Sequence, residues 1–113
     1  MRILRVAAAA ALIAIGAAAL VSPRRSSHQF GIATDDPDAV AFVRAVGARD
    51  VVLGLILLPL EGAAARRALA WVSLLGLCDA AIGVSARGPR PQQLIHLSGF
   101  LALALSSLGT PDR

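Results

Sequence analysis

Apolar residues fill four long stretches of the chain, and polar residues lie mainly between them. The four stretches cover residues 4–22, 39–60, 66–86 and 92–109. A helix needs about 20 residues to cross the hydrocarbon core of a bilayer, so each stretch has the length of one membrane span. Residues 23–38 form a polar loop. The pattern predicts an all-α, polytopic membrane protein, a four-helix transmembrane bundle folded as a single domain over residues 1–113.

The first apolar stretch admits two interpretations. It is rich in alanine, and the long side chain of Arg5 can carry its charge to the lipid headgroups. A basic start, an apolar run and a small-residue site at Ala17–Ala19 are also the pattern of a cleaved signal peptide. Because three more apolar stretches follow, we expect the first helix to be retained.

The polar segments between the stretches predict the connectivity. Pro23 ends the first helix because it has no backbone N–H, and Asp35–Asp38 provides carboxylates that cap the second. His28 has no ligand-like neighbours and is expected to be a solvated loop residue. Residues 61–65 and 87–91 form short turns, so the last three helices should be antiparallel neighbours. Both termini then lie on one side of the membrane.

Composition and charge agree with a membrane protein. Hydrophobic residues make up 57% of the chain and charged residues 16%, whereas an average soluble chain is about one quarter charged. The single cysteine excludes a disulfide framework within the chain. All eleven basic residues are arginines, scattered singly and in pairs beside the apolar stretches. This distribution favours the lipid bilayer as partner and argues against nucleic acid.

The arginines indicate the orientation only weakly. They divide almost equally between the two predicted faces of the bundle, and the positive-inside rule counts basic residues. We expect a multi-pass protein with cytoplasmic termini.

Ionisable residues inside the apolar stretches are the candidate functional residues. Arg49, Asp50 and Asp79 lie near the centres of predicted spans, and His96 lies at a similar depth. Such residues face a bundle interior or a cavity and need partners. Neighbouring Arg49 and Asp50 should point about 100° apart on a helix and so not simply neutralise each other. We expect the four side chains to converge, with Asp50, Asp79 and His96 as catalytic candidates and Arg49 as a binding candidate.

Two glycine-flanked carboxylates suggest a helix contact. Gly47 and Gly54 flank Asp50, and Gly76 and Gly83 flank Asp79 with the same spacing. Small residues allow membrane helices to approach closely. The repeat predicts that the helices over 39–60 and 66–86 pack on each other through these glycines.

The second stretch also resembles a family signature. Phe42, Arg44, Gly47, Arg49, Asp50 and Gly54 follow the order of the small four-helix membrane proteins called the domain of unknown function 4267 family. Asp79 and His96 match the Asp of the third helix and the His of the fourth in that family. Val43 stands where the family often has Tyr, so any role of the tyrosine hydroxyl in the family does not extend to this chain. The resemblance covers roughly residues 40–108; it implies the fold and a membrane location but no chemistry.

Three functions follow from these features. The first is a non-catalytic membrane subunit or interaction protein, as a homo-oligomer or as the partner of another membrane protein, whose buried Arg/Asp/His cluster is structural. The second is an intramembrane acid–base enzyme, an isomerase or cyclase, acting on a lipophilic small molecule. The third is proton-coupled transport by an oligomer. We favour the first, and we expect neither a cofactor nor a metal, because no ligand spacing recommends one.

Overall fold

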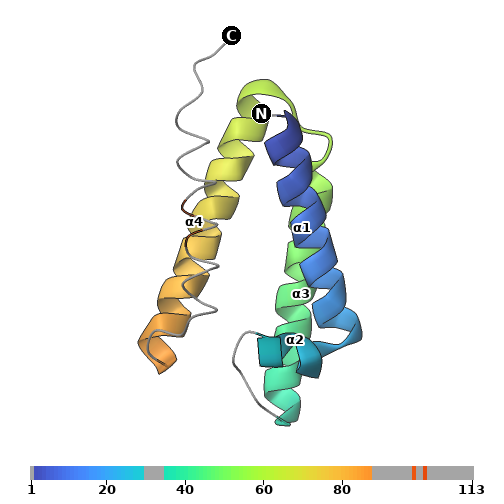
Figure 1. Cartoon of the computed structure of the whole chain (residues 1–113), viewed down its shortest axis with the longest axis vertical. Helices are drawn as coiled ribbons and strands as arrows, with labels where there is room; N and C mark the ends of the chain where they lie inside the picture. The colour runs from blue at the N-terminus through green and yellow to red at the C-terminus, as the bar shows by residue number, and fades with distance from the viewer. Residues whose placement is uncertain (1, 30–34, 88–97, 99–100, 102–113) are drawn as a thin grey trace. The chain divides into compact units, whose positions relative to one another are not determined.

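The computed structural model describes residues 2–29 and 35–87, and Ser98 and Leu101 singly. It contains four helices and, among these residues, no strand (Figure 1). The helices are α1 (Arg2–Val21), α2 (Pro23–Gln29), α3 (Pro37–Leu57) and α4 (Gly62–Arg87). The predicted all-α class is therefore confirmed. The fourth apolar stretch, 92–109, lies almost entirely outside the described residues.

The chain divides into two compact units. The single domain expected from the sequence stays a prediction. The first unit is Met1–Pro59, with α1, α2 and α3, and the second is Leu60–Arg113, with α4. Each is described below by itself.

Proline begins two of the helices instead of only ending one. α1 stops at Val21 because Pro23 has no N–H to continue its hydrogen bonds, but the same proline starts α2. The polar loop predicted for 23–38 is thus wrong over 23–29. There, Ser27 is 2% exposed and donates its hydroxyl to the carbonyl of Arg24 at 2.9 Å. This local hydrogen bond satisfies a polar side chain that the sequence interpretation placed in solvent.

α3 begins at its predicted cap. The side chain of Asp36 accepts from the backbone N–H of Asp38 at 3.1 Å, and Pro37 occupies the first turn. The capping carboxylates expected at 35–38 are therefore confirmed, with the helix starting at 37 instead of 39. At the other end, Leu58 donates its N–H to the carbonyl of Gly54 at 3.2 Å, and Pro59 follows.

α1 and α3 form an antiparallel pair in the first unit (Figure 1). Gly16 lies against Gly47, and Ala9 lies against Gly54. From the first contact to the second, the residue number rises from 47 to 54 on α3 and falls from 16 to 9 on α1, so the two helices run antiparallel. Seven residues are close to two helical turns, so each pair of positions lies on one helix face.

The contact between α1 and α3 brings backbone against backbone. A Cβ atom added to Gly16 would lie 2.5 Å from the carbonyl oxygen of Gly47, and one on Gly47 would lie 2.7 Å from that of Gly16. A Cβ on Gly54 would lie 2.8 Å from the carbonyl oxygen of Ala9. These glycines therefore set the separation of the two helices, because any side chain there would push them apart.

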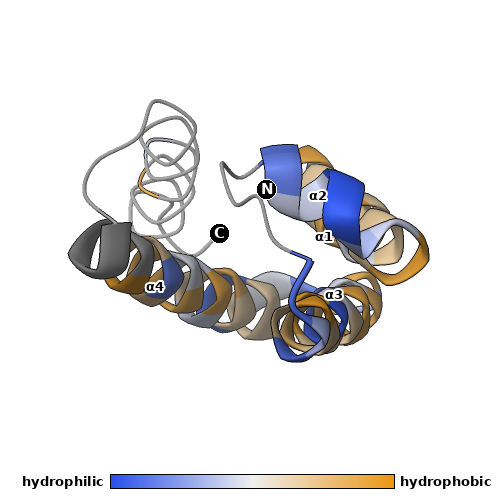
Figure 2. Ribbon diagram, turned by 90° about the horizontal axis from the view of Figure 1, so that it is seen from below, coloured by the Kyte–Doolittle hydropathy of each residue, from blue (hydrophilic) through white to orange (hydrophobic). Residues whose placement is uncertain are grey.

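Large aliphatic residues of the first unit lie on its outside. The buried positions of α1 and α3 are mostly small, and α2 adds a polar segment across their end (Figure 2). The exposed large apolar residues on these two helices are Ile3, Val6, Ile15, Leu20, Val21, Phe42, Val52, Leu55 and Ile56. Apart from Arg5 and Leu57, the buried positions of α1 and α3 are glycine or alanine, whereas these large apolar residues are exposed, which differs from the usual core of a soluble protein.

α4 is longer at its start than predicted. It begins at Gly62, which has a φ of 55°, so most of the turn expected at 61–65 is helical. Over residues 62–82, its buried positions are Ala65, Leu69, Val72, Ser73 and Gly76, which share one helix face. The hydroxyl of Ser73 donates to the carbonyl of Leu69 at 2.7 Å, a bond that satisfies this buried side chain.

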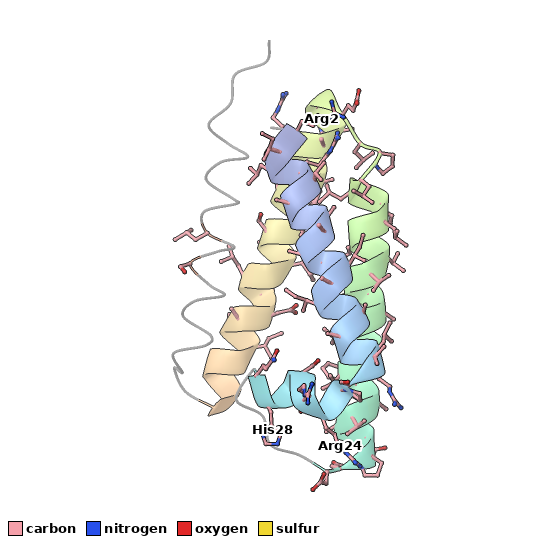
Figure 3. The ribbon with its side chains drawn as sticks, turned by 45° about the vertical axis from the view of Figure 1, so that its right-hand side comes forward. Arg2, Arg24 and His28 are labelled. Atoms are coloured by element: carbon pink, nitrogen blue, oxygen red, sulfur yellow. The ribbon has the colours of Figure 1, made fainter. Side chains whose placement is uncertain are left out.

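One helix of the described residues, α1, is long and apolar enough to cross a membrane. The most apolar 18-residue segment of this helix has a mean hydropathy of 2.2, and only 22% of that segment is buried within the protein. Polar side chains gather at the two ends of the first unit: Arg2 lies at one end of α1, and Arg24 and His28 lie at the other (Figure 3). His28 is exposed as expected, but it lies on α2 instead of in a loop.

Candidate functional site

Arg49 and Asp50 form an ion pair within α3. Nε and Nη2 of Arg49 both donate to Oδ1 of Asp50, at 3.2 and 3.1 Å. The side chain of Arg49 is 34% exposed and that of Asp50 is 16% exposed. The expectation that these neighbours do not neutralise each other is therefore wrong. The long arginine side chain bends along the helix surface and reaches the adjacent carboxylate despite the angle between the two Cα–Cβ bonds.

The ion pair lies between the two glycine contacts of α3. Gly47 and Gly54, on either side of it, are buried against α1. A carboxylate and a guanidinium that meet on one helix bring their opposite charges together. The cost of keeping charge in an apolar helix falls when the charge is paired.

The glycine contact expected between the second and third apolar stretches needs correction. The nearest atoms around Gly47 and Gly54 belong to α1, at Gly16, Ala19, Ile13 and Ala9. Gly76 is buried on α4 and Gly83 lies within the same helix. The glycines of α3 thus pack a helix pair, but their partner is α1 because its small residues allow the backbones to meet.

The other predicted site residues are not brought into one described site. Asp79 is exposed on α4, in the second unit, whereas Asp50 is in the first. His96 lies outside the described residues. The convergence of Arg49, Asp50, Asp79 and His96 therefore stays a prediction. Within the described part of the chain, no group of three His, Cys, Asp or Glu side chains is placed to hold a metal ion.

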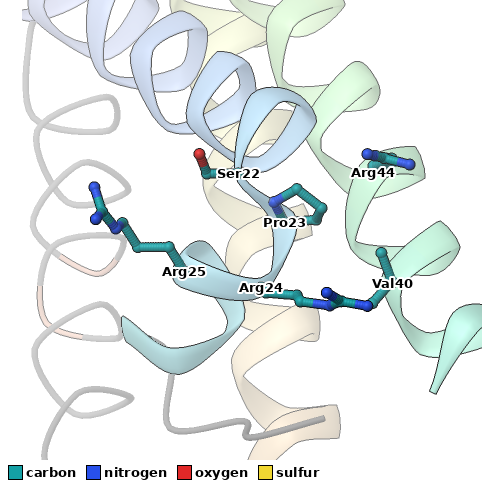
Figure 4. Close-up of a pocket in the computed structure, with 6 residues that line it drawn as sticks. All are labelled: Ser22, Pro23, Arg24, Arg25, Val40 and Arg44. Carbon is teal, nitrogen blue, oxygen red and sulfur yellow. The ribbon is translucent and has the colours of Figure 1, made fainter. Parts of the chain in front are cut away.

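A basic pocket of the first unit was missed by the sequence interpretation. It has a volume of about 460 Å³ and is lined by Ser22, Pro23, Arg24, Arg25, Val40 and Arg44 (Figure 4). The arginines at 24 and 25 had been assigned only to the membrane flank. In the sequence, Val40 and Arg44 are four residues apart and so share one face of a helix. Nothing in the sequence places that face beside Arg24.

Over the described residues, these features define a small all-helical protein with a glycine-packed helix pair and an ion pair beside that contact. The chain belongs to the family described as domain of unknown function (DUF4267), whose model matches residues 9–110. The resemblance drawn from the residues around Arg49 and Asp50 is thereby confirmed. No curated protein and no solved structure matches the chain.

Proposed function

We propose that this protein is a multi-pass membrane protein without catalytic activity, which serves as a subunit or interaction partner within the bilayer. One observation carries the proposal: α1 and α3 bury glycine and alanine between them and expose large aliphatic side chains. In water this arrangement leaves apolar surface hydrated, whereas lipid tails solvate it. Close backbone packing is also how helices associate in lipid, where burial of apolar surface gives no driving force.

The Arg49–Asp50 pair supports a structural role for the charges of α3. A working acid–base group must present a proton donor or acceptor to a substrate. Oδ1 of Asp50 accepts two hydrogen bonds from Arg49, and the contact joining α1 to α3 lies on either side of the pair. We infer that the pair allows α3 to carry charge through an apolar environment.

Substitution of an outward-facing residue tests the membrane assignment. Val52 is 53% exposed on α3, so Val52→Arg should leave the folded core intact in water. In a membrane span, an arginine near the helix centre costs roughly 2.5–3.5 kcal/mol on insertion scales. We expect wild type to resist alkaline carbonate extraction and Val52→Arg to reach the membrane fraction in sharply reduced amount.

Gln29→Arg provides the matched control. Gln29 is exposed at the end of α2, where an added arginine meets water or headgroups, so its membrane fraction should equal that of wild type. Release of wild type by carbonate, with Val52→Arg as abundant as wild type, would contradict the proposal. Mass spectrometry of the purified protein tests the non-catalytic part. A stoichiometric lipophilic molecule that is lost in a folded Asp50→Asn variant would favour the intramembrane enzyme instead.

A further inference from the structure

We propose that the basic pocket of the first unit binds a phosphate group, supplied by the headgroup of an anionic phospholipid or by a soluble phosphate. The pocket lies where the corner between α1 and α2 meets the first turns of α3. None of the functions considered above uses it. At about 460 Å³ it has room for a phosphate together with part of the group that it esterifies.

Two arginines from different helices approach the same space. Arg24 extends from α2 toward Val40 on α3, and Arg44 lies one turn further along α3 (Figure 4). Arg25 also lines the pocket, but its side chain extends away from Val40 and Arg44 (Figure 4). A guanidinium binds phosphate through two parallel N–H donors, so arginines on facing helices can hold one phosphate from two directions. Arg24 and Arg44 are therefore the principal ligands.

The charge of the pocket favours an anion. Its six lining residues include three arginines and no carboxylate. Arg24 pairs with a carboxylate outside the pocket lining: Oδ1 of Asp35 lies 3.6 Å from its Nε. The side chains of this pair are 68% exposed for Arg24 and 94% exposed for Asp35, and such exposed pairs contribute little. A phosphate, with more charge and more acceptor oxygens, can displace Asp35.

The position of the pocket agrees with a lipid source. It lies directly after Val21, the last residue of the apolar helix α1. If α1 crosses the bilayer, as the proposed function requires, the pocket lies at the depth of the headgroups, where arginines meet lipid phosphates. The lipid source thus rests on the proposed function, whereas phosphate binding itself does not.

Binding is measured on the full chain in a neutral detergent, by titration calorimetry with three probes. The probes are inorganic phosphate, a short-chain phosphatidic acid and a short-chain phosphatidylcholine. We expect saturable binding of phosphatidic acid and weak or no binding of phosphatidylcholine, whose choline offsets the phosphate charge. Phosphatidic acid binding at least tenfold more tightly than inorganic phosphate identifies the lipid as the source. Equal affinity for the two identifies soluble phosphate.

Three variants assign the binding to the pocket. Arg24→Gln and Arg44→Gln should each weaken binding about 10-fold, the loss expected for a charge-assisted contact. Asp35→Asn should strengthen binding about 2- to 5-fold, because it removes a competing carboxylate. The control is Arg2→Gln, which removes the same charge at the opposite end of α1 (Figure 3) and should leave the affinity unchanged.

Two results would overturn the inference: no saturable binding of either phosphate probe to folded protein, or an equal loss in Arg2→Gln and Arg24→Gln. The second result would mean that only the overall positive charge matters. Failure of the proposed function gives a different result. If carbonate releases the protein but it still binds inorganic phosphate through Arg24 and Arg44, the phosphate site is supported and the membrane assignment is wrong.

Discussion

Arg49 places its guanidinium on the carboxylate of the next residue, with both contacts on Oδ1 of Asp50. The pair is partly buried, at 34% and 16% exposure of the two side chains, so water screens it less than a surface pair. Removal of either partner takes away both hydrogen bonds and the ion pair that join the two side chains. The two side chains are therefore expected to be energetically coupled.

A double-mutant cycle measures this coupling. Arg49→Ala and Asp50→Asn should each destabilise the protein, and the double variant should lose less than the sum of the two by about 1 kcal/mol. The measurement is thermal unfolding of the four proteins in one detergent. Arg44→Ala combined with Asp50→Asn is the control: Arg44 lies six residues before Asp50, on a different face of α3, and the effects should add. Additive losses for Arg49 and Asp50 would contradict the pairing.

The helix pair α1–α3 is in contact at glycines, which have no side chain. Gly16, Gly47 and Gly54 meet backbone atoms of the facing helix at distances that leave no room for a Cβ atom. In this pair, shape alone determines which faces meet, because small residues are the places where the two backbones can touch.

Gly54→Ala tests this contact by the sign of its effect. Alanine normally stabilises a helix relative to glycine by about 1 kcal/mol. Here the new methyl would lie 2.6 Å from Cγ1 of Ile13 and 2.8 Å from the carbonyl oxygen of Ala9, so we expect destabilisation by about 1–3 kcal/mol. Thermal unfolding gives the difference from wild type. Ala48→Leu, an enlargement at an exposed position of the same helix, should change stability by less than about 0.5 kcal/mol. A more stable Gly54→Ala variant would refute the close approach.

The sequence predicted the helices better than their contacts. Apolar runs and the Asp36–Pro37 cap were sufficient to locate α1 and α3. The glycines at 47 and 54 were identified as packing positions, but the matching spacing of Ala9 and Gly16 in α1 was not. In a run as rich in alanine as α1, many positions are small, so spacing alone does not say which face meets a partner.

α2 and the basic pocket could not be predicted for a related reason. Residues 23–29 carry no apolar periodicity. Pro23 predicts the end of the first helix, but proline is also common in the first turn of a helix, as it is in α2. The helix depends on its packing against α1 and α3 and on the hydrogen bond of Ser27. Likewise, Arg24 and Arg44 are far apart in sequence and share a pocket only because the chain turns at Ser22.

At the largest scale, we propose that the first unit is a membrane hairpin. α1 meets the length and hydropathy of a span, α3 packs antiparallel to it, and both expose large apolar residues. If α1 and α3 both cross the bilayer, Arg2 and Glu61 lie on one side and Gln29 lies on the other. The basic pocket then lies on the same side as Gln29.

The hairpin also predicts that α1 is retained in the mature protein. Cleavage near Leu20 would remove the helix that covers Gly47 and Gly54, leaving backbone exposed along α3. We expect the intact mass of the membrane-extracted protein to include residues 1–22, as measured by mass spectrometry. A mature start near Leu20 would support the signal-peptide interpretation and leave α3 without this partner.

Cysteine labelling tests the hairpin most directly, because the chain has one native cysteine, Cys78. In a Cys78→Ser background, single cysteines replace Arg2, Gln29 or Glu61, which are all exposed. Sealed vesicles of known orientation are treated with a membrane-impermeant maleimide, before and after permeabilisation. We predict that positions 2 and 61 label from one side and position 29 from the other. Labelling of all three positions from the same side of intact vesicles would contradict the membrane hairpin.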